Sequence, residues 1–170
     1  NSIFELYASW GVDYIKVADI ARPYRVDAIE MVRKAIDNCG RPMVLSLSPG
    51  EALVDSSAHL TSHANMWRTT DDFWDNWSDL KYQFSMLPMG KFIRGQRATN
   101  RMTNFTENEQ YSLMTLWCIS RSPLIFGGNL PDNDALTNKL ITNGEVLKMH
   151  AHSSGNRQLF RDGDIIAWAA

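Results

Sequence analysis

The chain has 170 residues, of which 44% are hydrophobic and 21% charged, and this composition is typical of one folded globular domain rather than of a disordered protein. Its 17 basic and 19 acidic residues give a net charge of −2, which provides no electrostatic basis for binding nucleic acid or an acidic membrane surface. No apolar stretch approaches the roughly 20 residues that cross a bilayer, so we expect no membrane span.

Short apolar segments alternate with helical patterns in the first half of the chain. Apolar residues between Val26 and Cys39 recur at helical spacing, and Gly40 ends that pattern. The predicted elements, in chain order, are a helix over 4–10, a strand and its following loop over 13–20, a helix over 26–39, a strand over 43–47, a helix over 53–63 and a very short strand over 65–68. This alternation favours a parallel sheet whose strands are joined by helices.

The second half of the chain is predicted to be mainly helical until its last residues. Thr106 and Glu109 form a capping box, which indicates the start of a long helix that reaches to about Ser122. The other predicted elements are a helix over 73–84, a strand over 124–128 with a glycine turn, helices near 133–142 and 144–150, and a hairpin over 158–168 whose turn is Asp162-Gly163.

The order of these elements predicts an α/β fold. No glycine-rich phosphate-binding motif follows any predicted strand, which counts against a nucleotide-binding fold. A (β/α)8 TIM barrel fits the alternation better, but such a barrel typically takes about 250 residues. We therefore expect the C-terminal part of a (β/α)8 TIM barrel over residues 1–154, about strands 4 to 8, followed by the start of an antiparallel β domain over residues 155–170.

Cysteine and histidine spacing gives little indication of a metal site. Cys39 and Cys118 lack a paired CxxC spacing, so two buried thiols are favoured over a disulfide. His59 and His63 stand four residues apart, as two metal ligands on one helix face would. No third ligand lies near them in the sequence, and we expect no metal.

Three places after predicted strands carry polar side chains, and the catalytic residues of a barrel gather at such places. Lys16 shares one strand face with position 18, and it is either paired in the interior or placed at the exposed end of the strand. The hydroxyls of Ser46 and Ser48 either bind a polyol or cap a loop. The segment 67–72, Trp-Arg-Thr-Thr-Asp-Asp, either aims a carboxylate at a sugar or caps the start of a helix.

Four segments of the sequence carry a family resemblance, in the order and direction of that family. Residues 10–17 read Trp-Gly-Val-Asp-Tyr-Ile-Lys-Val, residues 67–72 are followed by Trp77, residues 121–128 read Arg-Ser-Pro-Leu-Ile-Phe-Gly-Gly, and residues 143–147 read Asn-Gly-Glu-Val-Leu. Each is weak alone, but together they resemble glycoside hydrolase family 27, the melibiase or α-galactosidase group, and its bacterial members above all. The resemblance covers nearly the whole chain, as part of a longer protein.

The resemblance implies retaining hydrolysis of a terminal α-galactoside or a related oligosaccharide or polysaccharide. Such enzymes use a nucleophile and a general acid/base whose carboxyl groups stand about 5–5.5 Å apart. By motif position Asp72 is the general acid/base, Arg68 holds a sugar hydroxyl, and Lys16 binds the sugar and favours the ionised nucleophile. Ser48 is a further candidate for binding the sugar. Neither a metal nor an organic cofactor is implied, and a secreted or periplasmic location is suggested.

The sequence departs from this family in three places. The nucleophile is expected at position 18, where this chain has Ala18, whose methyl group cannot form the glycosyl–enzyme intermediate. Asp19 is adjacent, but strand alternation points it away from Lys16 unless a local bulge turns it. Ser48-Pro49-Gly50 stands where many members have Cys-Glu-Trp, and a loop that the family carries is missing after Phe84.

Three functions are compatible with these residues. The first is a retaining enzyme resembling an α-galactosidase, inactivated at Ala18 by natural or deliberate replacement of an aspartate. The second is a non-catalytic carbohydrate-binding pseudo-hydrolase that keeps Lys16, Arg68 and Asp72 for the sugar. The third is part of a barrel without a sugar site.

Overall fold

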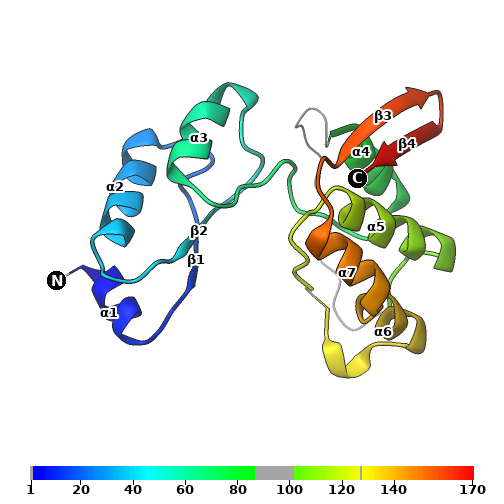
Figure 1. Ribbon diagram of the computed structural model, residues 1–170, viewed down its shortest axis with the longest axis horizontal. Coiled ribbons are helices and arrows are strands. Elements are labelled where there is room, and N and C mark those ends of the chain that lie inside the picture. The colour runs from blue at the N-terminus through cyan, green and yellow to red at the C-terminus, as the bar shows by residue number, and fades with distance from the viewer. Residues whose placement is uncertain (1, 87–101, 127) are drawn as a thin grey trace. The chain divides into compact units, whose positions relative to one another are not determined.

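The computed structural model describes residues 2–86, 102–126 and 128–170 of the chain, which form two compact units (Figure 1). One unit contains the described residues up to Trp74 together with Ser85 and Met86, and the other contains Asp75–Phe84 together with the described residues from 102 onward. Both units combine helices with strands, which confirms the predicted α/β class. None of the helices within the described residues has both the length and the apolar character needed to cross a membrane.

Two parallel strands organise the first unit. In chain order its elements are α1 (Ile3–Ser9), β1 (Tyr14–Val17), α2 (Val26–Asp37), β2 (Val44–Leu47), a 3-10 turn (Val54–Ser56) and α3 (Ser57–His63). β1 and β2 pair in parallel from Tyr14 opposite Val44 to Val17 opposite Leu47, and α2 is the helix that connects them. The short strand predicted over 65–68 is reduced to a parallel bridge of Met66 with Ser46.

The core of the first unit lies between β2 and the helices. Ile29, Val32 and Ile36 repeat at helical spacing on one face of α2, and all three are buried. Residues 45–47 of β2 are buried in succession, so this strand is covered on both faces, as expected for a strand inside a parallel sheet. α2 contacts both α1 and α3, and Figure 1 shows it between them. The apolar face of α2 is therefore what holds this unit together.

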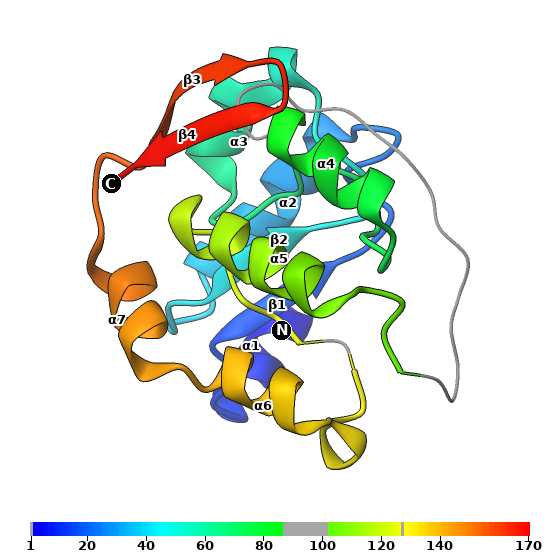
Figure 2. The ribbon, with the colours of Figure 1, turned by 90° about the vertical axis from the view of Figure 1, so that its right-hand side faces the viewer.

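Helices make up most of the second unit, in which α5 contacts α6 and α7 (Figure 2). The elements in this part of the chain are α4 (Trp77–Met86), α5 (Glu107–Ile119), a 3-10 turn (Leu130–Asp132), α6 (Ala135–Ile141), α7 (Gly144–His152), β3 (Arg157–Asp162) and β4 (Ile165–Ala169). Leu80, Leu116 and Cys118 are fully buried. Burial raises the pKa of the Cys118 thiol, which therefore stays protonated at neutral pH.

Polar side chains begin the helices of the second unit by accepting backbone hydrogen bonds. Thr106 accepts from the N–H of Glu109, and the Glu109 carboxylate accepts the N–H of Thr106 at 2.8 Å, so the predicted capping box is confirmed. At α6, Asp134 accepts the N–H of Thr137 at 2.7 Å, and this bond lowers the pKa of the Asp134 carboxyl. Asn143 caps α7 in the same manner.

The C-terminal hairpin pairs β3 with β4 in antiparallel order. Its two-residue loop is Gly163-Asp164, one residue later than the predicted Asp162-Gly163 turn, which is therefore wrong by one position. Gly163 has φ +55°, a left-handed conformation that glycine adopts easily because it has no Cβ. The first loop position requires this conformation, so glycine takes it and Asp162 pairs with Ile165 instead.

The strand predicted over 124–128 is not formed in the described residues 124–126 and 128, which are irregular. A strand needs a neighbour to take up its backbone hydrogen bonds, and the described part of the chain pairs none with this segment. The helix predicted over 73–84 begins later, at Trp77. The segment after Phe84 in which the family carries a longer loop continues beyond Met86 into 87–101, outside the described residues.

Removing the cap of α5 is expected to destabilise the second unit. Thr106→Ala takes away the oxygen that accepts the Glu109 N–H, and the loss of such a cap costs about 1 kcal/mol of unfolding free energy. Thr106→Ser keeps that oxygen and should stay within about 0.5 kcal/mol of the parent chain. Urea unfolding followed by circular dichroism measures both variants. Equal stability of the alanine variant and the parent would show that the capping box contributes nothing.

Candidate functional site

The carboxyl ends of β1, β2 and the bridge at Met66 lie at one edge because all three segments run parallel. Hydrogen bonds continue the pairing beyond the strands: the Ser48 N–H donates to the Val17 carbonyl and the Leu47 N–H to the Met66 carbonyl, both at 3.0 Å. The loops that follow the three segments therefore leave from the same edge. In a barrel this is the edge at which catalytic residues gather.

Lys16 lies one residue before the end of β1, opposite Ser46 of β2. Partners in adjacent strands share a face, so the Lys16 side chain stands on the face that holds Ser46 and, through the bridge, Met66. Lys16 is exposed, whereas Ser46 is buried. Of the two placements considered for this lysine, the described residues show the exposed one, in which its cation avoids the cost of burial.

Ser48 lies directly after β2 and is buried, with 6% of its surface exposed. Its carbonyl accepts the N–H groups of Ile20 and Ala21, both at 3.3 Å, so the loop after β1 folds over it. Little of the Ser48 residue is therefore accessible to a sugar. Ser48 is therefore a weaker candidate for sugar binding than Lys16.

Arg22 and Asp71 join the loop after β1 to the loop after Met66. The Arg22 Nη1 and Nη2 atoms donate to the two Asp71 carboxylate oxygens at 3.1 and 2.9 Å. Asp71 is 7% exposed and Arg22 38%, so the acceptor side of the pair is buried. Two-pronged pairing of this kind fixes geometry as well as adding energy. The sequence motifs do not point to this pair, because its members stand 49 residues apart.

Gly50, in the loop after β2, lies against the Arg22 guanidinium. A Cβ added at this position would stand 2.5 Å from the Arg22 Cζ atom, closer than side chains approach one another. Gly50 also has φ +73°, in the left-handed region that glycine adopts without a steric cost. The loops after β1, β2 and Met66 therefore meet around a single ion pair.

Arg68 and Asp72, both predicted as site residues, contact each other directly. The Arg68 Nη1 atom stands 2.8 Å from the Asp72 Oδ1 atom, and the two side chains are 21% and 68% exposed. The Arg68 carbonyl also accepts the Ala52 N–H at 2.8 Å. This bond holds the start of the Arg68 loop beside the loop after β2, so the arginine and the carboxylate are presented at the strand ends.

Helix capping does not explain the adjacent carboxylates of Asp71 and Asp72. α4 begins at Trp77, five residues after Asp72. Its first turn is capped by the Asn76 side chain, which accepts the N–H of Asp79 at 2.8 Å. Because Asp71 and Asp72 pair with arginines instead, the capping interpretation of this segment is wrong.

Ala18 and Asp19 follow β1, which ends at Val17, and both are exposed. Asp19 has φ +60°, the left-handed conformation that aspartate adopts more readily than most residues. Strand alternation therefore stops before Asp19 and does not determine where its carboxylate points. The Asp19 carbonyl accepts the Arg25 Nε–H at 3.1 Å, a bond that helps to hold the turn.

In the second unit, the sequence motif over residues 121–128 contacts α7. The motif over residues 143–147 forms the start of that helix. Arg121 donates to the carbonyls of Ser153 and Ala151 at 2.9 and 3.3 Å. The Ser122 carbonyl stands 2.8 Å from the Nε2 atom of His150. These contacts engage backbone carbonyls and the His150 side chain at the end of α7, which indicates a structural role for the motif over residues 121–128.

Comparison with solved structures shows which enzymes the chain resembles. The chain is 46% identical to the family 27 β-L-arabinopyranosidase of Geobacillus stearothermophilus and matches its structure with a TM-score of 0.87, over 97% of this chain and 44% of that one. A variant of the same enzyme with an aspartate replaced by alanine, in complex with arabinose, matches with a TM-score of 0.86 over the same shares. The chain is therefore similar to enzymes of glycoside hydrolase family 27 over nearly its whole length.

Curated relatives of the chain are α-galactosidases of plants and other organisms. Alpha-galactosidase 2 of Arabidopsis thaliana is 26% identical over 175 residues, which cover 96% of this chain and 44% of that protein. The chain thus spans less than half the length of the curated relatives it matches. No family model matches the chain. The resemblance that the four sequence motifs indicated is confirmed.

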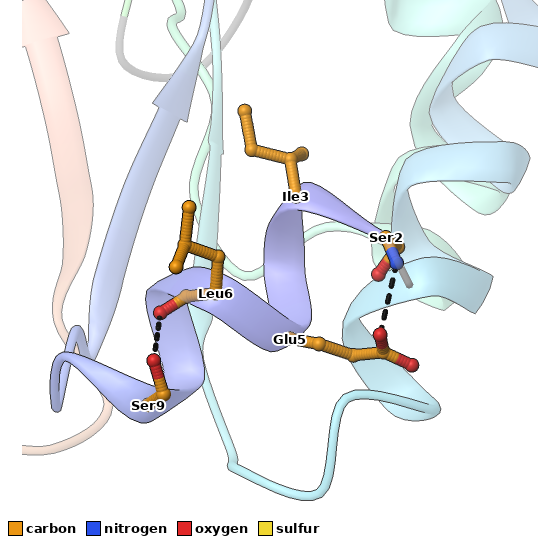
Figure 3. Close-up of a pocket in the computed structure, with 5 residues that line it drawn as sticks. All are labelled: Ser2, Ile3, Glu5, Leu6 and Ser9. Carbon is orange, nitrogen blue, oxygen red and sulfur yellow. Dashed lines mark hydrogen bonds between the residues drawn. The ribbon is translucent and has the colours of Figure 1, made fainter.

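A hollow on the surface of the chain lies beside α1 rather than at the strand ends (Figure 3). The residues that line it are Ser2, Ile3, Glu5, Leu6 and Ser9. Two hydrogen bonds within α1 already engage polar groups of these residues: the Ser2 N–H donates to the Glu5 carboxylate at 2.9 Å, and the Ser9 hydroxyl donates to the Leu6 carbonyl at 2.7 Å. We assign this hollow no part in sugar binding.

Replacing Asp71 is expected to destabilise the chain far more than replacing its neighbour Asp72. Asp71→Asn removes the buried charge that faces Arg22, which we expect to lower the free energy of unfolding by about 1–3 kcal/mol. Asp72→Asn affects an exposed pair and should change it by less than about 0.5 kcal/mol. Urea unfolding of both variants tests the difference, and equal effects would contradict the role assigned to the Arg22–Asp71 pair.

Proposed function

We propose that the chain forms part of a retaining glycoside hydrolase that acts on terminal α-galactosides and related sugars. In this proposal residues 1–154 are the C-terminal part of a (β/α)8 TIM barrel, and residues 155–170 begin an antiparallel β domain. The observation that carries it is the placement of Lys16, Arg68 and Asp72 around the carboxyl ends of adjacent parallel segments in a chain similar to family 27 enzymes.

The relatives support a particular configuration of the sugar. The matched proteins are named as α-galactosidases and as a β-L-arabinopyranosidase. β-L-Arabinopyranose has the ring configuration of α-D-galactopyranose and lacks only the hydroxymethyl group at C5. A site that binds the shared hydroxyls accommodates either sugar. The space beside C5 then changes the relative kcat/KM of the two sugars only modestly, because they differ by one small group. We assign the substrate class by this shared configuration.

The proposed reaction uses one group from each of the two loops that Arg22 and Asp71 join. Asp72 protonates the glycosidic oxygen as its bond to the anomeric carbon breaks, while a carboxylate at position 18 attacks that carbon from the opposite face. Water then cleaves the glycosyl ester, and Asp72 accepts the proton of that water. Ala18 has no oxygen with which to form the ester, so turnover by this route stops before its first step.

Arg68 and Lys16 are proposed to hold the sugar. The contact of Arg68 with Asp72 engages the Nη1 atom, and the guanidinium has further N–H groups that can donate to a sugar hydroxyl. Lys16 offers three N–H donors near the end of β1, and its positive charge would stabilise a carboxylate at position 18. Sugar binding is therefore proposed to survive the loss of the nucleophile.

A second candidate function is a non-catalytic carbohydrate-binding protein, and Ala18 is the observation that favours it. A methyl group stands exposed directly after β1, where the retaining reaction requires a carboxylate. A protein that only binds sugar would keep Lys16, Arg68 and Asp72. It would not recover turnover when one carboxylate is restored, because the remaining geometry would no longer be held for catalysis.

Restoring the carboxylate separates the two functions. Ala18→Asp, made in the complete polypeptide, is expected to release nitrophenol from an aryl α-galactoside or an aryl β-L-arabinopyranoside at least about 100-fold faster than the parent. The initial rates on the two substrates also show which sugar is preferred. A silent Ala18→Asp variant that still binds galactose or arabinose would support the carbohydrate-binding protein instead.

Azide and a second variant make this test specific to position 18. Azide is small enough to enter the space of a missing carboxylate, so it should accelerate turnover of an activated substrate by the Ala18 protein. Asp19→Asn examines the neighbouring carboxylate in the parent. Turnover by the parent that disappears in Asp19→Asn would make Asp19 the nucleophile, and the assignment to position 18 would then be wrong.

The role of Asp72 is tested in the Ala18→Asp background. Asp72→Ala is expected to lower kcat/KM by about 10²–10⁴-fold for poor leaving groups and to spare activated dinitrophenyl glycosides, because a good leaving group needs no protonation. Asp37→Ala is the matched control, since Asp37 forms an exposed pair with Arg33 at the same i,i+4 spacing as Asp72 with Arg68. Equal losses for all leaving groups would exclude a general acid at Asp72.

A further inference from the structure

A cluster of side chains that commonly bind metals joins α2 to α3 in the first unit. Glu30 lies on α2, and His59 and His63 lie one helical turn apart on α3. One carboxylate oxygen of Glu30 and one ring nitrogen of each histidine all lie within 4.8 Å of one another. The two imidazole rings are stacked, with their centroids 4.2 Å apart. Tertiary packing thus supplies the third ligand that the sequence spacing did not show.

Hydrogen bonds orient both histidine rings. The His63 Nδ1 atom stands 2.9 Å from the His59 carbonyl, and because a carbonyl only accepts, Nδ1 carries the hydrogen and Nε2 keeps its lone pair in the neutral ring. The His59 Nδ1 atom bonds to the Tyr24 hydroxyl at 2.7 Å, and its Nε2 atom stands 3.3 Å from Glu30. Histidines that bind metals are held in this way, with one ring nitrogen hydrogen-bonded and the other facing the ion.

Tyr24 is a suitable partner for His59. Its hydroxyl oxygen can accept the hydrogen of Nδ1 across their 2.7 Å contact. Its ring packs edge-on against the His59 ring, with centroids 5.7 Å apart. The His59 side chain is 21% exposed and that of Glu30 is 53% exposed, so the cluster is open to solvent on one side. This opening provides a path for an ion and room for a water ligand.

We propose that Glu30, His59 and His63 bind a divalent transition metal, with Zn²⁺ as the ion that fits best. The bound ion would link α2 to α3. Two imidazole nitrogens and a carboxylate oxygen are donors that Zn²⁺ binds at about 2.0–2.2 Å, with a water as the fourth ligand. The half-exposed Glu30 side chain can rotate toward the histidines to reach that spacing.

The proposed metal site is separate from the residues proposed for sugar hydrolysis. Glu30, His59 and His63 are not among the residues assigned to the sugar or to proton transfer. α2 connects β1 to β2 and α3 follows β2, so the ion would join the helices that precede and follow β2 in the chain. Because only the folded chain presents the three ligands together, Zn²⁺ is expected to stabilise the fold by mass action.

Zinc titration of the chelator-treated full chain tests the site. Calorimetry should show one Zn²⁺ bound per chain, and the unfolding temperature should rise with Zn²⁺. Glu30→Gln and His63→Ala should each weaken binding at least about tenfold, and Tyr24→Phe about tenfold through the His59 ring. His152→Ala is the matched control and should bind as the parent does, since the His152 Nδ1 atom also stands 2.9 Å from the carbonyl four residues earlier.

If a variant fails to fold, a measurement on the unaltered chain still tests whether these residues bind Zn²⁺. Zn²⁺ should protect His59 and His63, but not His152, from modification by diethyl pyrocarbonate. The proposal is overturned by the absence of Zn²⁺ binding, by equal affinity of the parent and the Glu30 and His63 variants, or by equal protection of all these histidines.

Discussion

The two-pronged contact between Arg22 and Asp71 is the interaction on which the strand-end site depends. It ties the loop after β1, which begins at Ala18, to the loop that carries Asp72. A retaining glycosidase needs its two carboxyl groups about 5–5.5 Å apart, so the separation of these loops has to be held to a small fraction of that distance. Strand pairing alone does not hold it, because the pairing ends before either loop begins.

Elements whose signals are local could be predicted from the sequence. The apolar spacing of α2 and the capping box at Thr106 each depend on residues a few positions apart, and the structure confirms both. Residues 124–128 have the composition of a strand, yet a strand forms only where a second strand pairs with it. The Arg22–Asp71 contact joins residues 49 positions apart, and no local pattern indicates such a partner.

The sequence predicts which residues belong to the candidate site, but not which of them contact one another. Family motifs indicate which residues matter, and this led to Arg68 and Asp72, which the structure shows in direct contact. Motifs carry no information about backbone conformation beyond a strand, and the left-handed turn at Asp19 removes the alternation from which its orientation was inferred. Ala18 stands directly before that turn. Lys16 near the end of β1, and position 18 and Arg68 in the loops, thus belong to one supporting framework.

Gly50 limits how this chain can change in evolution. Its missing side chain leaves the space that the Arg22 guanidinium fills. A larger residue at position 50 would push the guanidinium away from Asp71, and a different residue at position 22 would leave the buried carboxylate without its partner. We therefore expect positions 22, 50 and 71, which lie in three separate stretches of the sequence, to vary together or not at all among related sequences.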